Sequence, residues 1–342
     1  MENCISTTIS RLDGRALAPA AKYSGLEPSP PTISLIVCTR NRAEKLPQVL
    51  RALLTLHLPS QVKVEFIVVD NGSTDETRQV LALAEKMFDG RLRRVAAPTP
   101  GLGHARNVGL AESQGAILAF VDDDVIPRQD WLETVCSEFA ADKNLALLSG
   151  QVQLRNPLDL PLAIRTSTAR RHFDSVADAF SLLAGCHFAV RREFAELAGG
   201  FDNTLGAGTP FPVEDADFFY RVWRTGGKLV YEPSLFAWHD HGRRSPEDQR
   251  AIVRGYIFGR GAFYSKHVFA RDKSVLQAFY WELVSLSKSL VRGTSKYGWR
   301  SLGWLLGGFG IHSLAAAWRS SNRRMTTNVR SAVSVAGSAK PS

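Results

Sequence analysis

The stretch from Ala116 to Asp124, AILAFVDDD, places three adjacent carboxylates directly after an apolar run. An apolar run of this length bounded by turn residues is typical of a short buried strand. Three acids at one strand end repel one another and resist joint ionisation. A hard divalent cation such as Mg2+ or Mn2+ would relieve the repulsion, because it prefers carboxylate oxygens. A solvated acidic turn that caps the next helix would also explain the triplet.

The segments on both sides of this stretch alternate between predicted strands and helices. We predict strands at 33–38, 64–69, 92–95, 117–121 and 145–149, and helices at 43–56, 75–88, 104–113 and 129–141. Such alternation indicates an α/β fold with a mostly parallel, doubly wound sheet. Ligands of these sheets bind at the carboxyl ends of the strands. The loops after Cys38, Val69 and Val121 lie at such ends.

Composition and charge narrow the class of protein. The chain has 342 residues, of which 44% are hydrophobic and 22% charged, as in a globular protein with ample core. The net charge of +9 suits an anionic partner such as a nucleotide, a nucleic acid or an acidic membrane surface. Widely spaced cysteines indicate a reducing compartment. Since residues 1–10 lack the features of a secretory signal, we expect a cytoplasmic protein.

The chain is predicted to divide into four regions. Residues 1–31 are a polar, disordered lead-in, and 32–245 form the α/β domain, with later strands at 182–190 and 228–231 and a helix from about 213. Residues 246–320 form a helical extension, with helices at 247–269, 274–290 and 299–318, and 321–342 a basic, disordered tail.

The apolar segment 302–317 would be about 24 Å long as a helix, shorter than a bilayer core of about 30 Å. A Gly-rich core helix or an interfacial helix fits this segment better than a membrane span.

Two strand-end loops carry groups that suit a nucleotide. Thr39, Arg40 and Asn41 supply a hydroxyl, a guanidinium and an amide after the first strand. An ordinary helix cap with an exposed Arg would explain that loop as well. Asp70 ends the second strand, where its carboxylate is a natural acceptor for a nucleobase N–H or a ribose hydroxyl.

Three further segments carry candidate site residues. The loop at 100–109 is not a dinucleotide fingerprint, because Arg106 replaces its third glycine, but the helix it enters would face a phosphate. Glu214 and Asp215 open a helix, either as complements of its dipole or with one acid as a general base. His239 and His241 form an HxH pair, which is either a pair of metal ligands or two surface histidines.

Taken in order, these segments resemble the inverting glycosyltransferases of family 2, which have the GT-A fold. The resemblance runs from about 33 to 239, and it rests on the order and spacing of TRNR (39–42), VVDNGSTD (68–75), GLGHARNVG (101–109), VDDD (121–124), GGFD (199–202) and the Glu-Asp pair (214–215). It implies a GT-A type doubly wound mixed sheet flanked by helices, followed here by a C-terminal helical extension.

The resemblance also implies roles for individual residues. The donor is a nucleotide-diphosphate sugar, with Thr39, Arg40, Asn41 and Asp70 on the nucleoside side, Asp122 or Asp123 near the ribose, and Arg106 near the phosphates. Mg2+ or Mn2+ is held mainly by Asp124, with Asp122 as the other outer acid and His239 within reach. Asp215 is the catalytic base and Glu214 positions the acceptor. Asp215 takes the acceptor hydroxyl's proton as the anomeric configuration inverts.

Other features of the sequence narrow the activity. The QxxRW motif of processive members is absent, and the segment 221–224 reads RVWR. The absence of that motif favours transfer of one sugar to a hydroxyl of a glycan or lipid-linked acceptor. A sugar-nucleotide nucleotidyltransferase would have a Gly-rich loop after the first strand, and a non-catalytic nucleotide-sugar-binding module would tolerate loss of the acids. Since the basic residues are spread out or lie in the tail, without a patch of interleaved aromatic residues, we expect no nucleic-acid partner.

The helices from about 279 to 319 combine Trp, Tyr and Leu with Lys and Arg. They suit peripheral contact with the anionic inner face of the plasma membrane, and equally packing on the catalytic core or a dimer contact. We expect a role in cell-envelope polysaccharide or glycolipid synthesis. The donor sugar, its nucleotide base, the acceptor and the oligomeric state depend on pocket details that the sequence does not specify.

Overall fold

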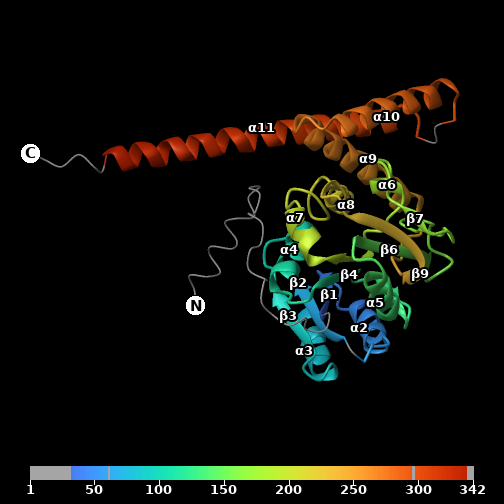
Figure 1. Ribbon diagram of the computed structural model, residues 1–342. Helices are drawn as coiled ribbons and strands as arrows, with labels where there is room; N and C mark the ends of the chain where they lie inside the picture. The colour runs from blue at the N-terminus through green and yellow to red at the C-terminus, as the bar shows by residue number, and fades with distance from the viewer. Residues whose placement is uncertain (1–31, 61, 295–296, 337–342) are drawn as a thin grey trace, which may run out of the picture. The chain divides into compact units, whose positions relative to one another are not determined.

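The computed structural model describes residues 32–60, 62–294 and 297–336 (Figure 1). The predicted lead-in at 1–31 lies outside the described residues. The chain forms two compact units, which divide between Ile252 and Val253. The division falls within helix α9 (Pro246–Phe269). The two units are described separately below.

The first unit is built on one mixed sheet whose strands follow the order β3-β2-β1-β4-β8-β6-β9-β5, with β7 paired to β9. The strands are β1 (Thr32–Thr39), β2 (Lys63–Asp70), β3 (Leu92–Ala96), β4 (Ile117–Asp122), β5 (Val125–Pro127), β6 (Leu145–Leu154), β7 (Arg171–His172), β8 (His187–Arg191) and β9 (Lys228–His239). Strands β3, β2, β1 and β4 are parallel, whereas β8 runs antiparallel to both β4 and β6. The predicted α/β mixed sheet is confirmed.

Helices cover both faces of this sheet (Figure 1). They are α2 (Leu46–Leu54), α3 (Thr77–Met87), α4 (Leu102–Glu112), α5 (Trp131–Ala141), α6 (Asp178–Ser181), α7 (Arg192–Leu197) and α8 (Glu214–Arg224). Leu46, Leu81 and Trp131 of α2, α3 and α5 belong to one buried apolar cluster with the β1, β2 and β4 side chains of one face. On the other face α4 lies close to β1, because Gly109 has no side chain: a methyl group there would come within 2.5 Å of Ile36.

Phenylalanines fill the space between the sheet and α8. Phe188 of β8 stacks on Phe120 of β4 with ring centroids 5.0 Å apart, and Phe201 stacks on Phe218 of α8 at 4.1 Å. Phe219 meets Phe188 edge to face at 5.0 Å. These rings fix the start of α8 against β4 and β8, which brings its first acids to the end of the sheet where β4 ends.

Strands β8 and β9 differ from the sequence prediction. The predicted strand at 182–190 is a strand only from His187 to Arg191, and Gly185 before it lies against the Asp215 side chain of α8. Strand β9 is longer than 228–231 and continues to His239 through an irregular register at Gly150 and Gln151 of β6. Gly150 admits this irregularity, since a methyl group there would lie 1.9 Å from the Leu235 carbonyl oxygen.

The second unit consists of the rest of α9, α10 (Lys273–Val291) and α11 (Trp299–Ala336). Glycines let α9 and α11 touch: a methyl group at Gly261 would lie 2.1 Å from the Leu305 carbonyl oxygen, and one at Gly308 1.9 Å from that of Phe258. Helix α11 extends to Ala336, where the sequence predicted a disordered tail from 321. No Pro or Gly interrupts the chain between 311 and 336. Residues 337–342 lie outside the described residues.

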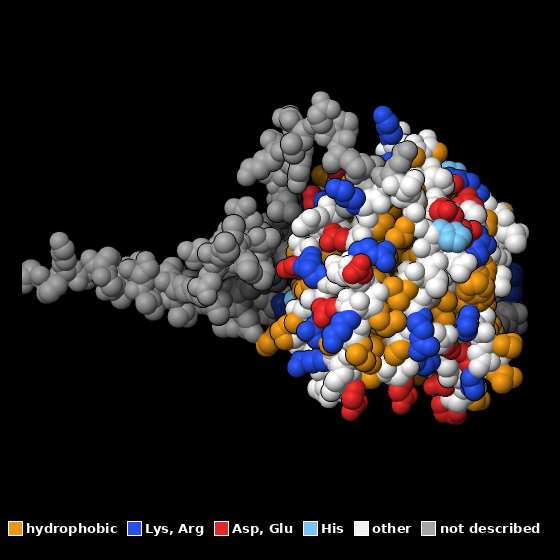
Figure 2. Space-filling model, turned by 90° about the horizontal axis from the view of Figure 1, so that it is seen from below, with side chains coloured by type: hydrophobic (Ala, Val, Ile, Leu, Met, Phe, Trp, Pro, Cys, Tyr) orange, Lys and Arg blue, Asp and Glu red, His pale blue; other side chains and the backbone are white. Residues whose placement is uncertain are grey.

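In the described part of the chain, no helix has the length and apolarity needed to cross a membrane. Figure 2 shows the face of the molecule on the side of α2 and α3 in Figure 1, with basic and acidic side chains interspersed over it. This view has no continuous basic surface.

Candidate active site

The carboxyl ends of β1, β2 and β4 bring the predicted strand-end residues together. In the sheet register Thr39 is opposite Asp70, and Cys38 is opposite Asp122. The chain turns after Asp122, so that Asp123 and Asp124 lie between β4 and β5 and are buried. The loops predicted to form one site therefore do share one edge of the sheet.

Each acid of the triplet contacts a cationic or basic group of the protein. Asp122 Oδ1 lies 2.9 Å from Arg106, and Asp123 Oδ1 lies 3.4 Å from Nε of Arg42. Asp124 lies 3.6 Å from Arg42 and 3.2 Å from Nε2 of His239. The repulsion that the sequence predicted is thus offset by side chains of the protein itself.

The environment separates the pKa values of these acids. Burial raises the pKa of Asp123 to about 6, although Arg42 opposes the shift. Burial also raises the pKa of Asp122 against the opposing effect of Arg106. For Asp124 burial acts in the same direction, but the hydrogen bond and charge of His239, together with Arg42, lower the pKa to about 2. Asp124 is therefore the acid of the triplet held most firmly in its charged form.

Arg106 of α4 links the acidic strand end to the start of α8. Its guanidinium lies 3.1 Å from Oε1 of Glu214, and it donates a hydrogen bond of 3.0 Å to the Gly185 carbonyl. The side chain is only 2% exposed. Burial disfavours its charge, but Asp122 and Glu214 outweigh that effect and raise its pKa above the usual value. The sequence predicted Arg106 near the donor phosphates, whereas here its donors are bound to protein groups.

Glu214 and Asp215 lie side by side in the first turn of α8 but in different surroundings. Glu214 is buried, and burial together with the charge of Asp215 raises its pKa to about 7 while Arg106 opposes the shift. Asp215 is half-buried, and its carboxylate lies against Gly185, where a methyl group would come within 1.9 Å of Oδ2. The more accessible acid is thus the predicted base.

The predicted nucleoside-binding residues occupy the loops after β1 and β2. Thr39 is buried, and its hydroxyl makes no hydrogen bond of good geometry among the described residues, although its interaction with the Asp123 carboxyl acts to lower the pKa of that acid. Arg40 is exposed. Asn41 has a left-handed backbone with φ of 53°, and its side-chain oxygen accepts a hydrogen bond from the Thr74 amide. Asn41 therefore joins the two loops in this structure.

Asp70 also has partners within its own loop. It accepts a 2.8 Å hydrogen bond from the Ser73 amide and lies 3.4 Å from Nε of Arg78. Asp70 is buried and ends β2, so its carboxylate lies at the same edge of the sheet as Thr39.

The two imidazoles of the HxH pair lie edge to face with ring centroids 5.0 Å apart, but their nitrogens meet different partners. His239 lies beside Asp124, and its Nδ1 is buried without a hydrogen-bond partner in the described chain. His241 instead contacts the Leu160 carbonyl and lies 3.8 Å from Asp159. Among the described residues, no group of three or more His, Cys, Asp or Glu side chains could hold a metal ion by itself. Asp124 and His239 remain adjacent as two potential ligands.

Sequence reasoning missed three residues of this site. Arg42, which contacts Asp123 and Asp124, was visible in the TRNR segment, but the prediction chose its neighbours. Asn71 binds the Ala97 and Thr99 carbonyls and the Gly101 amide, and so anchors the loop that precedes α4. Gly185 carries no signal in the sequence, because its role depends on its closeness to Asp215.

Comparison with known families and proteins agrees with this architecture. Residues 34–197 match the family model "Glycosyl transferase family 2". The chain is 30% identical over 217 residues to glycosyltransferase AglE of Haloferax volcanii, covering 61% of this chain and 67% of that protein. It is 30% identical over 212 residues to succinoglycan biosynthesis protein ExoM of Rhizobium meliloti, covering 60% of this chain and 65% of that protein.

A longer relative and solved structures extend the comparison. The pre-mycofactocin glycosyltransferase of Mycobacterium tuberculosis is 29% identical over 249 residues, which is 69% of this chain but 47% of that protein. Mannosyltransferase PcManGT of Pyrobaculum calidifontis, solved with GDP-Man and Mn2+, has a TM-score of 0.58 at 20% identity and covers 97% of this chain and 88% of that one. GalNAc-T7, solved with UDP, GalNAc and Mn2+, has a TM-score of 0.51 at 17% identity, covering 75% and 55%.

The mixed sheet and these fold neighbours show the GT-A fold, and the family match and the relatives show the class of a glycosyltransferase. The protein is thus a transferase. The chain belongs to glycosyl transferase family 2. Family membership also sets it apart from the nucleotidyltransferase and the non-catalytic binding module considered from the sequence.

Proposed function

We propose that the protein transfers one sugar from a nucleotide-diphosphate sugar to a hydroxyl of a glycan or lipid-linked acceptor, with inversion at the anomeric carbon. The observation that carries this proposal is the pair of acids at the start of α8. Asp215 is half-buried and free of any ion pair in the described structure, whereas Glu214 beside it is buried against Arg106. Such a pair supplies a base and a group that holds its surroundings in place.

The proposed role of Asp215 is to accept the proton of the acceptor hydroxyl. As that oxygen bonds to the anomeric carbon, the bond to the nucleoside diphosphate breaks on the opposite face, and the diphosphate leaves with its electron pair. Gly185 has no side chain, and this leaves room for the Asp215 carboxylate in its present position. That close fit supports the proposed role of Asp215. Arg106 would act by fixing Asp122 and Glu214, because its buried guanidinium is shared between them.

The residues beside the acidic strand end fit a divalent cation. Asp124 offers a carboxylate with a lowered pKa, and His239 offers an imidazole whose Nδ1 has no partner in the described chain. Mg2+ is commonly held by one or two carboxylates together with substrate phosphates and waters, so a third protein ligand is unnecessary. Mg2+ or Mn2+ bound there would neutralise charge on the leaving diphosphate. Solved GT-A neighbours contain Mn2+.

The nucleoside is proposed to bind over the loops after β1 and β2. The buried Thr39 hydroxyl supports this placement, because it makes no hydrogen bond of good geometry within the described residues and lies beside Asp123 at the same strand end. Asp70 lies opposite it in the sheet register, with Arg40 and Asn41 in the same loop as Thr39. Asp122, at 29% exposure, and Asp123 would lie toward the ribose. One relative, named for succinoglycan biosynthesis, supports a role in polysaccharide synthesis.

Calorimetric titration of the purified protein with UDP, GDP and dTDP tests the donor site. We expect one nucleotide to bind with Mn2+ or Mg2+ and to bind weakly after EDTA. Asp124→Ala should lower its affinity in the presence of metal at least tenfold, whereas Asp130→Asn, a change in an acid outside the site, should leave it unchanged. Absence of binding to all three nucleotides with metal would contradict the proposal.

A further inference from the structure

The net positive charge of the chain is concentrated in the second unit. Residues 253–342 contain 14 Lys and Arg residues but only two acids, Asp272 and Glu282. Their formal net charge of +12 exceeds the +9 of the whole chain, so residues 1–252 are slightly acidic overall. A charge separated in this way along the sequence is typical of a segment that binds an anionic surface.

Both acids of this unit are bound to groups of the unit itself. Glu282 lies 2.8 Å from Arg260 and accepts a hydrogen bond of 2.5 Å from the Tyr264 hydroxyl. Asp272 caps α10, where its carboxylate accepts hydrogen bonds from the Ser274 and Val275 amides. Neither acid is therefore placed to neutralise the exposed bases of α10.

Helix α10 has an inner and an outer face. On the inner face Val275 is fully buried, and Phe279 stacks on Phe309 of α11 with ring centroids 5.0 Å apart. The outer face is defined here as Leu276, Tyr280, Trp281, Lys288, Val291 and Arg292. Its apolar members are 54–89% exposed, and no ion pair in the described chain involves its two bases.

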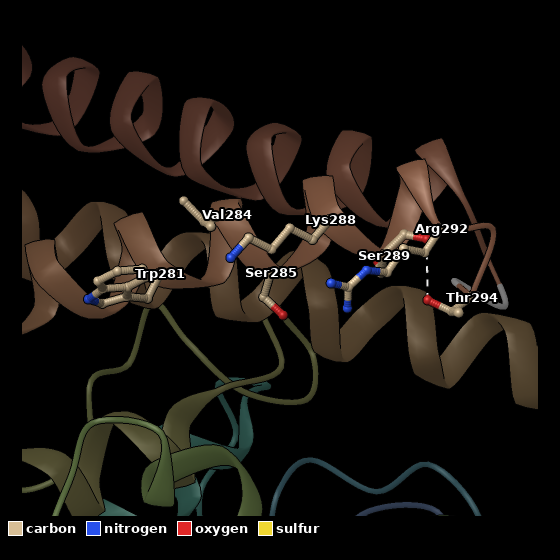
Figure 3. Close-up of a pocket in the computed structure, with 7 residues that line it drawn as sticks. All are labelled: Trp281, Val284, Ser285, Lys288, Ser289, Arg292 and Thr294. Atoms are coloured by element: carbon tan, nitrogen blue, oxygen red, sulfur yellow. Dashed lines mark hydrogen bonds between the residues drawn. The ribbon is translucent and has the colours of Figure 1, made fainter.

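A pocket of about 320 Å³ lies along this outer face (Figure 3). It is lined by Trp281, Ser285, Lys288, Ser289, Arg292 and Thr294, among others. Lys288 and Arg292 are one helical turn apart, so the ammonium and guanidinium groups lie on the same side as the hydroxyls. Hydroxyls and paired cations beside an indole ring match the phosphate and the interfacial region of a phospholipid.

We propose that the outer face of α10 binds the surface of a bilayer that contains anionic phospholipids. Lys288 and Arg292 meet lipid phosphates, while Trp281, Tyr280 and Val291 enter the interfacial region. Charge complementarity selects this occupant, because a neutral protein surface would leave the two bases unpaired. The proposed contact is peripheral: it involves the outer face of one amphipathic helix. This inference does not depend on the proposed activity.

Co-sedimentation of the full-length protein with vesicles tests the inference. We expect sedimentation with vesicles of phosphatidylcholine and phosphatidylglycerol in equal parts, little with phosphatidylcholine alone, and loss of binding at high ionic strength. Lys288→Gln combined with Arg292→Gln should lower the partition coefficient about 30-fold, since each base near the surface contributes about fivefold or more. Trp281→Ala should lower it independently.

The matched control removes two exposed bases of the first unit, Lys63 and Lys86, by the same Lys→Gln changes. It should bind vesicles like the wild type. Failure to bind anionic vesicles, or an equal loss in the control, would overturn the inference. Displacement by millimolar inorganic phosphate would overturn it too, in favour of a discrete phosphate site. A lipid-free dimer that Trp281→Ala dissociates would show that a second copy covers this face instead.

Discussion

At the scale of single residues, Arg106 holds the acids of the site together. Its buried guanidinium contacts Asp122 and Glu214, which come from elements far apart in the sequence. Removing one member of such a buried cluster leaves uncompensated charge in a poorly solvated place. Arg106 is therefore more important to the folded site than an exposed phosphate-binding arginine would be.

We predict that Arg106→Ala lowers the free energy of unfolding by about 3–5 kcal/mol near neutral pH. The pKa values of Asp122 and Glu214 are already raised, and without Arg106 they should rise further. A carboxyl group whose pKa is higher in the folded than in the unfolded state destabilises the folded state at pH values above its folded pKa. The loss of unfolding free energy caused by Arg106→Ala should therefore shrink as the pH falls through that folded pKa. Urea unfolding at neutral and mildly acidic pH measures both effects.

The matched control for Arg106 is Arg93→Ala. Arg93 forms an ion pair with Glu112 at 2.7 Å, but both side chains are about half exposed. Exposed pairs of this kind contribute about 0–1 kcal/mol. Equal losses in the two variants would show that the Arg106 cluster is not the structural centre that its burial indicates.

A second prediction at this scale concerns the pH dependence of transfer. Burial and Asp215 raise the pKa of Glu214 to about 7, so Glu214 gains its charge near neutrality. Ionised Glu214 pairs with Arg106, and this ion pair holds the start of α8, with Asp215, in place. We expect kcat/KM to rise with pH through about 7, and Glu214→Gln to lower kcat/KM and remove that inflection. An unchanged profile in Glu214→Gln would rule out this origin.

The sequence predicted the members of the site better than their contacts. The carboxyl ends of parallel strands meet at one edge of a sheet. This rule correctly predicted that Asp70, Asp122 and Thr39 lie together. The partners of Arg106 could not be predicted, because Asp122, Gly185 and Glu214 meet only through tertiary packing. Gly185 has no local pattern at all, so its contact with Asp215 required the structure.

At the scale of elements, local patterns predicted the helices and parallel strands of the first half well. Strands β1 and β2 are one residue longer than predicted at each end, and β4 is one residue longer at its carboxyl end only. The prediction failed to place the start of β8 and the length of β9, because both depend on pairing across the sheet. The spacing of apolar residues does not show that the Leu235 carbonyl packs against Gly150, a contact that allows β9 to continue.

The approach of the segment before β8 to α8 leads to a prediction. Gly185→Ala would place a methyl group within 1.9 Å of Asp215 Oδ2, so α8 or the carboxylate must shift. A shift of about 1 Å at a reacting group costs about 100-fold in rate. We expect kcat to fall by 10- to 100-fold in steady-state assays, by that same argument, while donor affinity measured by calorimetry is unchanged.

Gly303→Ala in α11 is the matched control, because nothing lies within 4 Å of a methyl group at that position. Its kcat should equal that of the wild type. Wild-type kcat in Gly185→Ala would show that the fit between Gly185 and Asp215 does not position the carboxylate. Loss of donor affinity in Gly185→Ala would instead indicate a wider disturbance of the site.

At the scale of the whole molecule, the family match and the candidate base come from different stretches of chain. The family model covers 34–197, which includes the acidic strand end but stops before Asp215. The matched regions also span only 47–67% of the curated relatives' own lengths. The donor and the acceptor of this protein therefore have to be identified by experiments on this chain and not taken from its relatives.

The measurement that tests the central claim most directly is release of nucleoside diphosphate from a panel of UDP-, GDP- and dTDP-sugars with Mn2+ or Mg2+, with and without candidate acceptors. Wild type, Asp124→Ala and Asp215→Asn should be compared. We predict turnover of one donor by the wild type, weak donor binding by Asp124→Ala, and normal donor binding with transfer reduced at least 100-fold in Asp215→Asn. Wild-type transfer by Asp215→Asn would contradict the assignment of Asp215 as the base.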